Sequence, residues 1–138
     1  MNSEAFLFSL VEDVQKREHE QGIDALDARE KVLFFVWELE AQVNNGGFNQ
    51  YFFNSGSNHA APTEEALRAI GAVNTASLLK EAMDVFGNGG PSPMRDERQN
   101  QLEAMSDEQE KAFDRLDEQF YLYPDDLSKL LAAFMQAE

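Results

Sequence analysis

The chain has 138 residues with no cysteine, and 43% of them are hydrophobic, which excludes disulfides, cysteine nucleophiles and a wholly disordered chain. Twenty-six acidic residues against 11 basic ones give a formal net charge of −15, which disfavours direct binding to nucleic acid or to an anionic membrane. The longest apolar runs are six residues long, whereas a membrane-spanning helix needs about 20, so we expect a soluble, cytoplasmic protein.

Helical periodicity dominates the first part of the chain, where apolar residues recur at i, i+3, i+4 and i+7. Residues from Leu7 to Val14 predict a first helix, which Gly22 ends. Asp27 and Glu30 have the spacing of a capping box and predict the start of a second helix. Apolar residues cover so much of this helix between positions 32 and 43 that we expect it to be central and mostly buried.

The central helix should bury Phe35 and Trp37. We expect Asn44-Asn45-Gly46-Gly47 to end it, since glycine readily adopts the left-handed conformation at a helix terminus. Residues 48–53 are short and aromatic, and their helical neighbours favour a helical segment over a strand.

Short helices are predicted for the second half of the chain. Thr63 and Thr75 are predicted N-caps, and the Gly- and Pro-rich residues 87–93 predict a loop. A helix over about 94–105 follows this loop. Further along, a second capping box and a proline predict two more helices.

That capping box consists of Ser106 and Gln109, and Pro124 should open the last helix. No run of alternating polarity is long enough for a sheet. We therefore expect residues 1–138 to form a single all-α domain of six to eight helices around the central apolar helix.

Few residues suggest catalysis, and no P-loop, dinucleotide-binding glycine pattern or HExxH pair is present. Ser55 or Ser57 with His59 could form a nucleophile and base, but polar loops collect such residues by chance. Asp125 and Asp126 could bind a metal, although charge at a helix N-terminus is a simpler role. We therefore expect no catalytic residue, metal or cofactor, and no enzyme activity.

Two further carboxylates, Glu38 and Glu40, lie in the central helix about 160° apart around its axis. A partly buried carboxylate there could act as an acid or base. The simpler interpretation is that one faces solvent and the other binds a backbone amide.

The most unusual segment is residues 43–56, in which aromatic side chains require burial and the amides of Asn45, Gln50 and Asn54 require hydrogen bonds. It could be a tight corner or a ligand pocket lined by those amides. Turn and cap chemistry accounts for each residue type and favours the corner. We predict a positive φ at one of its two glycines and a bond from at least one of the three amides to the backbone.

This segment resembles the signature of a bacterial all-helical family that was long of unknown function and is now associated with DNA-mimic proteins. The residues that carry the resemblance, here called the signature box, are Asn45, Gly46, Gly47, Phe48, Gln50, Tyr51, Phe52 and Asn54. The likeness continues at Trp37-Glu38, 66–67, 70–72, 116–121 and 127–131, and so covers most of residues 26–134. It implies an all-helical fold with no established catalysis, in which at least some members present acidic surfaces to DNA-binding proteins, including transcription regulators.

An acidic stripe agrees with that implication. Five acids on the helix after Ser106 fall within about 100° of arc, centred about 120° from its apolar face. They are Asp107, Glu110, Asp114, Asp117 and Glu118. This row carries about half the charge density of duplex DNA, so mimicry needs a second row. Asp96 and Glu103, which share a face of the preceding helix, are the expected second row.

We therefore expect an acidic DNA mimic, either a monomer or a homodimer, that binds the DNA-binding surface of a basic partner such as a transcription regulator and competes with DNA. The alternative is a non-catalytic interaction module, similar to an immunity protein or antitoxin, whose acidic face is only solvated surface. An uncharacterised hydrolase is the remaining class.

Overall fold

Seven α-helices, two short 3-10 helices and no strand make up residues 3–137, the part of the chain that this computed structural model describes. The α-helices are α1 (Ser3–Gln21), α2 (Ala28–Phe53), α3 (Ala60–Ala69), α4 (Val73–Asp84), α5 (Arg95–Glu103), α6 (Asp107–Tyr121) and α7 (Leu127–Gln136). The 3-10 helices are η1 (Ile23–Ala25) and η2 (Ser55–His59). The expected all-α fold is confirmed. None of these described helices is both long enough and apolar enough to cross a membrane.

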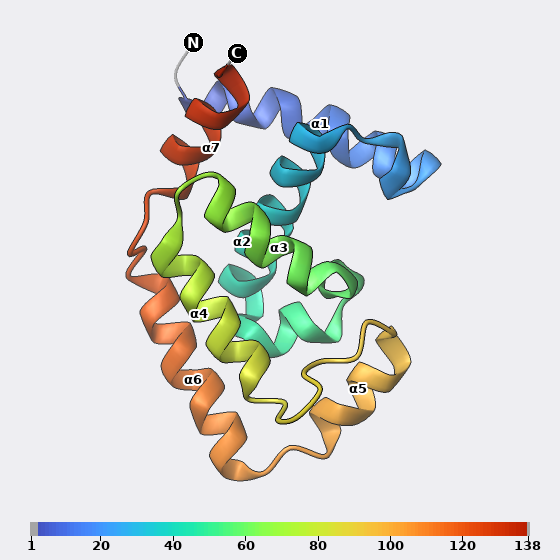
Figure 1. Ribbon diagram of the computed structural model, residues 1–138, viewed down its shortest axis with the longest axis vertical. Coiled ribbons are helices and arrows are strands. Elements are labelled where there is room, and N and C mark those ends of the chain that lie inside the picture. The colour runs from blue at the N-terminus through green and yellow to red at the C-terminus, as the bar shows by residue number, and fades with distance from the viewer. Residues whose placement is uncertain (1–2, 138) are drawn as a thin grey trace.

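Helix α2 organises the molecule, because α1, α3, α5, α6 and α7 all pack against it. Helix α4 is set further out and packs on α3 and α6 (Figure 1). Helices α1 and α7 pack together at one end, while α5 and the start of α6 lie at the other (Figure 1). The prediction of a central second helix is therefore confirmed.

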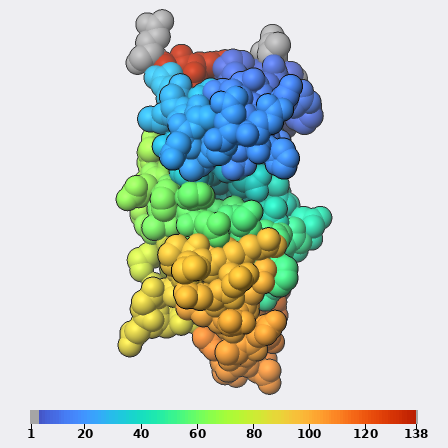
Figure 2. Space-filling model, turned by 90° about the vertical axis from the view of Figure 1, so that its right-hand side faces the viewer, coloured from blue at the N-terminus to red at the C-terminus, as the bar shows by residue number. Residues whose placement is uncertain are grey.

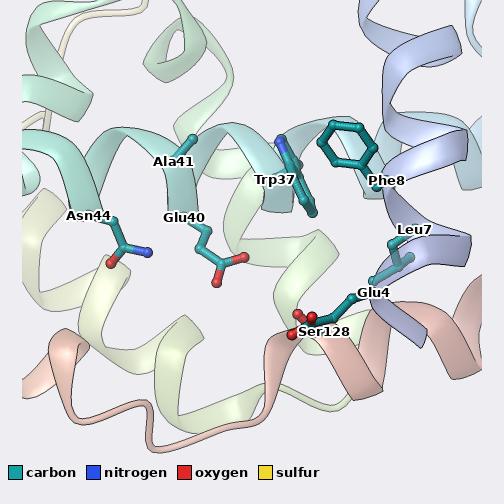
Figure 3. Close-up of a pocket in the computed structure, with 8 residues that line it drawn as sticks. All are labelled: Glu4, Leu7, Phe8, Trp37, Glu40, Ala41, Asn44 and Ser128. Carbon is teal, nitrogen blue, oxygen red and sulfur yellow. The ribbon is translucent and has the colours of Figure 1, made fainter. Parts of the chain in front are cut away.

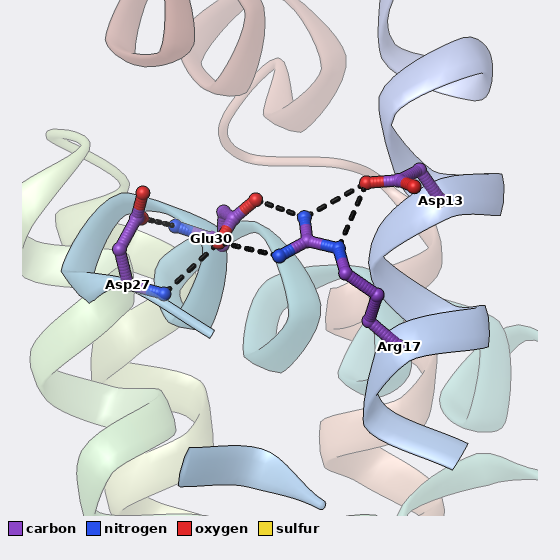
Figure 4. A network of polar contacts seen from close by, with 4 residues as sticks. All are labelled: Asp13, Arg17, Asp27 and Glu30. Atoms are coloured by element: carbon purple, nitrogen blue, oxygen red, sulfur yellow. Dashed lines mark hydrogen bonds and ion pairs between the residues drawn. The ribbon is translucent and has the colours of Figure 1, made fainter. Parts of the chain in front are cut away.

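The predicted capping box at the start of α2 is present. The Asp27 carboxylate accepts the Glu30 backbone N–H at 2.8 Å, and the Glu30 carboxylate accepts the Asp27 N–H at 3.0 Å. Glu30 also binds Arg17 of α1, which reaches Asp13 as well at 2.8 Å (Figure 4). The hydrogen bond from Arg17 lowers the pKa of Glu30. One carboxylate thus starts α2 and ties it to α1.

A kink at Gly46 and Gly47 divides α2. Gly47 has φ +74°, and the backbone of both glycines is non-helical, but a helical segment resumes after them and continues to Phe53. The predicted interruption, the positive φ and the helical character of residues 48–53 are confirmed. The kink matters because it turns the second segment so that its aromatic side chains enter the core.

Phe52 lies at the centre of an aromatic cluster and is fully buried. Its ring contacts those of Phe48, Tyr51, Phe86 and Phe113, with ring centroids 4.8–6.3 Å apart. Edge-on and offset ring pairs of this kind add stability beyond the apolar area they bury.

Two aromatic residues are less buried than the sequence predicts. Phe35 is buried as expected, but Trp37 is only partly buried and lines a surface cavity. Phe53 is 46% exposed, and its ring lies under the Arg95 guanidinium. Because α2 is apolar on nearly all sides, its sequence does not reveal which side remains uncovered.

Three predicted helix starts were wrong. Helix α3 begins before Thr63, whose hydroxyl donates to the His59 carbonyl at 2.8 Å. Helix α4 begins before Thr75, and α7 begins at Leu127 after the cap Asp126 rather than at Pro124. In α4 the capping oxygen comes from a distant part of the chain, which local spacing cannot predict.

Candidate partner-binding surface

Four of the five predicted acids on α6 form an exposed row. The Ser106–Gln109 capping box starts the helix as predicted, and Phe113, Leu116 and Phe120 bury its inner face. The exposed members, here called the α6 row, are Asp107, Glu110, Asp114 and Glu118. Among the described residues none of these four carboxylates forms an ion pair, so their charge is directed into solvent.

Asp117 differs from the rest of the predicted stripe. Its carboxylate is half-buried and accepts the Phe48 backbone N–H at 2.8 Å. Burial raises the pKa of Asp117, partly offset by that hydrogen bond. Asp117 is only about 40° from Phe113 around the helix, at the edge of the acidic arc nearest the core. Asp117 therefore stabilises the fold of α2. The prediction that it is an exposed member of the acidic stripe was wrong.

Basic side chains limit the row on one side. Lys111 lies 3.9 Å from Glu108 in an exposed ion pair. Arg115 lines a surface hollow together with Glu81 of α4. Four charges over residues 107–118 correspond to about one per 4.5 Å of helix, against one per about 1.7 Å of duplex DNA.

The two acids expected as a second row, Asp96 and Glu103, are exposed on α5, which packs on α2. Helix α5 lies beside the start of α6 only (Figure 2), and from there α6 runs away from α5 along the opposite edge of the molecule (Figure 1). An acid that lies beside α6 is Glu81, which is exposed on α4 and lines hollows together with Arg115 and Gln119. Sequence reasoning missed Glu81 because its position depends on how α4 packs against α6.

Behind the α6 row, Gly47 of the signature box fits closely against Asp117. A Cβ atom at Gly47 would lie 2.3 Å from an Asp117 carboxylate oxygen, and its positive φ also disfavours any side chain. The first N–H groups of a helical segment have no partner within it, so the Asp117 carboxylate caps the segment that starts at Phe48.

The amides of the signature box bind one another. Asn45 donates to Gln50 at 2.9 Å, while Gln50 and Asn54 both donate to the Gln42 side-chain oxygen at 2.8 and 2.9 Å. Asn54 also accepts from Arg95. The prediction that one of the three amides binds the backbone was wrong for the described chain. The arrangement still favours a structural corner, because each amide finds its partner inside the protein.

Arg98, which the sequence reasoning did not single out, is fully buried. Its guanidinium donates to the carbonyls of Phe52 at 2.6 Å, of Asn54 at 2.9 Å and of Ser92 at 2.9 Å. It also donates to the Asn58 side chain at 2.9 Å. Burial lowers the pKa of Arg98. The only sequence signal for the burial of Arg98 is that it lies four residues before Leu102, the one apolar residue of α5, so both side chains share one face of that helix.

The residues considered for catalysis have other partners. The Ser57 hydroxyl donates to the Phe52 and Asn54 carbonyls, and the His59 ring packs on Phe35 with centroids 5.2 Å apart. Glu38 lines a hollow of about 180 Å³ together with Ser55 and His59, and burial raises the pKa of Glu38. No hydrogen bond joins Ser55 to His59 in the described chain.

The remaining carboxylates considered for chemistry also have defined partners. Asp125 caps α4 by accepting from the Thr75 N–H at 2.7 Å and the Thr75 hydroxyl at 2.8 Å, and Asp126 caps α7. Glu40 accepts a hydrogen bond from the Tyr123 hydroxyl. The simpler cap interpretation of the aspartates therefore matches the geometry.

The fold and this surface define a small, acidic, all-α protein in which Asp117, beside the exposed α6 row, contacts the buried Gly47 and Phe48 of the signature box. The chain belongs to the DMP19-like protein family, whose model matches residues 24–138. This match confirms the resemblance on which the signature box was identified. No curated protein and no solved structure matches the chain.

Proposed function

We propose that this protein is a DNA mimic that binds the DNA-binding surface of a basic partner, such as a transcription regulator, and competes with DNA. The observation that carries the proposal is the α6 row, in which four exposed carboxylates without ion-pair partners follow one helix of a strongly acidic protein. Membership of the DMP19-like family is consistent with this role.

In this mechanism the carboxylates stand in for phosphates and meet lysine and arginine side chains of the partner. Opposite charge speeds association by steering the two proteins together. Salt weakens the complex because exposed charges are screened beyond about 8–10 Å at physiological ionic strength. The partner releases DNA because both ligands occupy one basic surface.

We further propose that the protein acts by binding rather than by catalysis, without a metal or cofactor. Support comes from the structural partners of the candidate catalytic groups. The Ser57 hydroxyl binds backbone carbonyls, and Asp125 and Asp126 cap helices. The proposed ligand is a protein, so the chain itself need not touch nucleic acid or membrane, and it acts as a monomer or a homodimer.

The direct test is a capture experiment followed by competition. The immobilised protein is exposed to extract of its own cell at low salt, and bound proteins are eluted by raising the salt concentration. Each eluted protein is then bound to labelled duplex DNA, and fluorescence anisotropy follows the DNA as the acidic protein is added. We expect basic DNA-binding proteins that elute with salt and release their DNA.

Other outcomes point to the other classes. A partner that stays bound at high salt and does not release DNA indicates an interaction module with a merely solvated acidic face. Turnover in a broad substrate screen indicates an enzyme. Either result contradicts the proposal.

A further inference from the structure

A cavity of about 370 Å³ lies between α1, α2 and the start of α7 (Figure 3). The lining residues that matter here are Glu4 and Phe8 of α1, Trp37, Glu40 and Asn44 of α2, and Ser128 of α7. No member of the α6 row lines this cavity. Its α1 wall also lies outside residues 24–138, the part of the chain that matches the family. The cavity is thus separate from the surface of the proposed DNA mimicry.

Two aromatic rings of this cavity are open to an incoming group. Trp37 is only partly buried, and Phe8 is 56% exposed. Elsewhere the chain covers aromatic rings with its own arginines, since Arg29 lies 5.8 Å from the centre of the Phe134 ring and Arg95 lies over Phe53. Among the described residues no cation lies over Phe8 or Trp37 in this way.

A carboxylate is held in place beside these rings. Glu40 is one helical turn from Trp37, so both side chains project from the same face of α2 (Figure 3). The Tyr123 hydroxyl donates to Glu40 at 2.5 Å and accepts from the Asn44 amide at 2.7 Å, which fixes the position of the carboxylate. Glu40 has no cationic partner among the described residues, and Glu4 adds a second negative charge to the cavity.

We propose that this cavity binds the side chain of an arginine from a partner protein. A planar guanidinium can stack on the face of Trp37 while the N–H groups at its edge donate to Glu40, whereas a lysine ammonium has no planar face to stack. The exposed Phe8 ring makes the surroundings of the cavity apolar, which suits a folded partner. The proposal does not depend on competition with DNA, because the cavity and the α6 row share no residue.

Trp37 makes the test direct, because it is the only tryptophan of the chain and its fluorescence reports on the cavity. A short capped peptide with one arginine is titrated into the full-length protein. Matched peptides carry citrulline, which has the shape of arginine without its charge, or lysine. We expect a saturable change in Trp37 fluorescence with the arginine peptide, a weaker response to lysine and none to citrulline.

Variants locate the binding. Glu40→Gln should weaken binding of the arginine peptide about tenfold, because a charged hydrogen bond is lost. Phe8→Ala should weaken it about threefold. Glu118→Gln, which removes an equal charge from the α6 row, should leave it unchanged, and circular dichroism checks that each variant is folded.

Several results would overturn the proposal. These are an equal response to citrulline or lysine, unchanged affinity in the folded Glu40→Gln variant, or no saturable change with arginine in the parent protein. None of these measurements contains DNA or a DNA-binding protein, so failure here is distinguishable from failure of the proposed mimicry.

Discussion

Gly47 is the residue at which the backbone conformation and the packing both require glycine. Replacing it with Ala should lower the free energy of unfolding by about 2–4 kcal/mol, because the new Cβ meets both a positive-φ backbone that only glycine readily adopts and the Asp117 carboxylate. Gly22→Ala is the matched control. Gly22 has φ +89° and ψ 170°, close to the backbone conformation of Gly47, but open space around it, so backbone strain is expected there without the added clash. Equal losses in urea denaturation would contradict the close packing of Gly47 on Asp117.

Asp117 should contribute to stability through its hydrogen bond rather than through its negative charge. Asp117→Ala leaves the Phe48 N–H without its acceptor and should lower the free energy of unfolding by about 1–3 kcal/mol. Asp117→Asn keeps an acceptor oxygen and should change it by less than about 1 kcal/mol at neutral pH. If Asn is as damaging as Ala, the hydrogen bond is not what Asp117 contributes.

The pH dependence of the same pair follows from the raised pKa of Asp117. A carboxyl whose pKa is higher in the folded than in the unfolded state contributes stability that is present below the unfolded pKa and lost as pH rises through the folded pKa. Asn does not titrate. The free energy of unfolding of Asp117→Asn, relative to the parent, should therefore rise as pH increases from about 4 toward neutrality. Denaturation at several pH values checks the sign.

At the scale of elements, Arg98 joins α5 to the end of α2. Arg98→Ala should lower the free energy of unfolding by about 3 kcal/mol or more, because carbonyls of Phe52, Asn54 and Ser92 lose their donor. Arg95→Ala is the matched control one turn earlier. Arg95 is exposed and should cost less than about 1 kcal/mol. Similar losses for the two variants, measured by thermal or urea denaturation, would contradict the role of Arg98.

Elements with local signals could be predicted from the sequence. The capping boxes at Asp27 and Ser106 consist of residues three positions apart, and the kink consists of two adjacent glycines. Each signal therefore lies within one short segment of the sequence. Interactions between segments distant in sequence could not be predicted. Asp117 caps the second segment of α2 at Phe48, 69 residues away, and Asp125 caps α4 at Thr75, 50 residues away.

The same division applies to the candidate site. Helical periodicity placed Asp107, Glu110, Asp114 and Glu118 on one exposed face, and the structure agrees. Periodicity gives the direction of a side chain relative to its own helix, but not what packs beside that helix. It therefore assigned Asp117 to the exposed stripe and could not place α5 relative to α6.

At the scale of the whole molecule, the effect of the net charge of −15 on partner binding must be distinguished from the effect of where the charges lie. A strongly acidic protein attracts basic proteins from any direction, so salt-sensitive binding alone does not identify a binding face. Removing the same number of charges from two different places makes that distinction.

The most direct measurement is the displacement of DNA from a captured partner by two triple variants. One combines Glu110→Gln, Asp114→Asn and Glu118→Gln on the α6 row. The other combines Glu12→Gln, Glu20→Gln and Asp24→Asn, which are exposed acids of α1 and η1. Both variants remove three charges, so their net charge is identical.

The account predicts that the α1–η1 variant displaces DNA nearly as well as the parent, while the α6-row variant needs about tenfold more protein for half-displacement. Both should remain folded, because exposed substitutions usually change the free energy of unfolding by less than about 0.5 kcal/mol each. If the two variants displace DNA equally well, the α6 row is only solvated surface and the central claim is wrong.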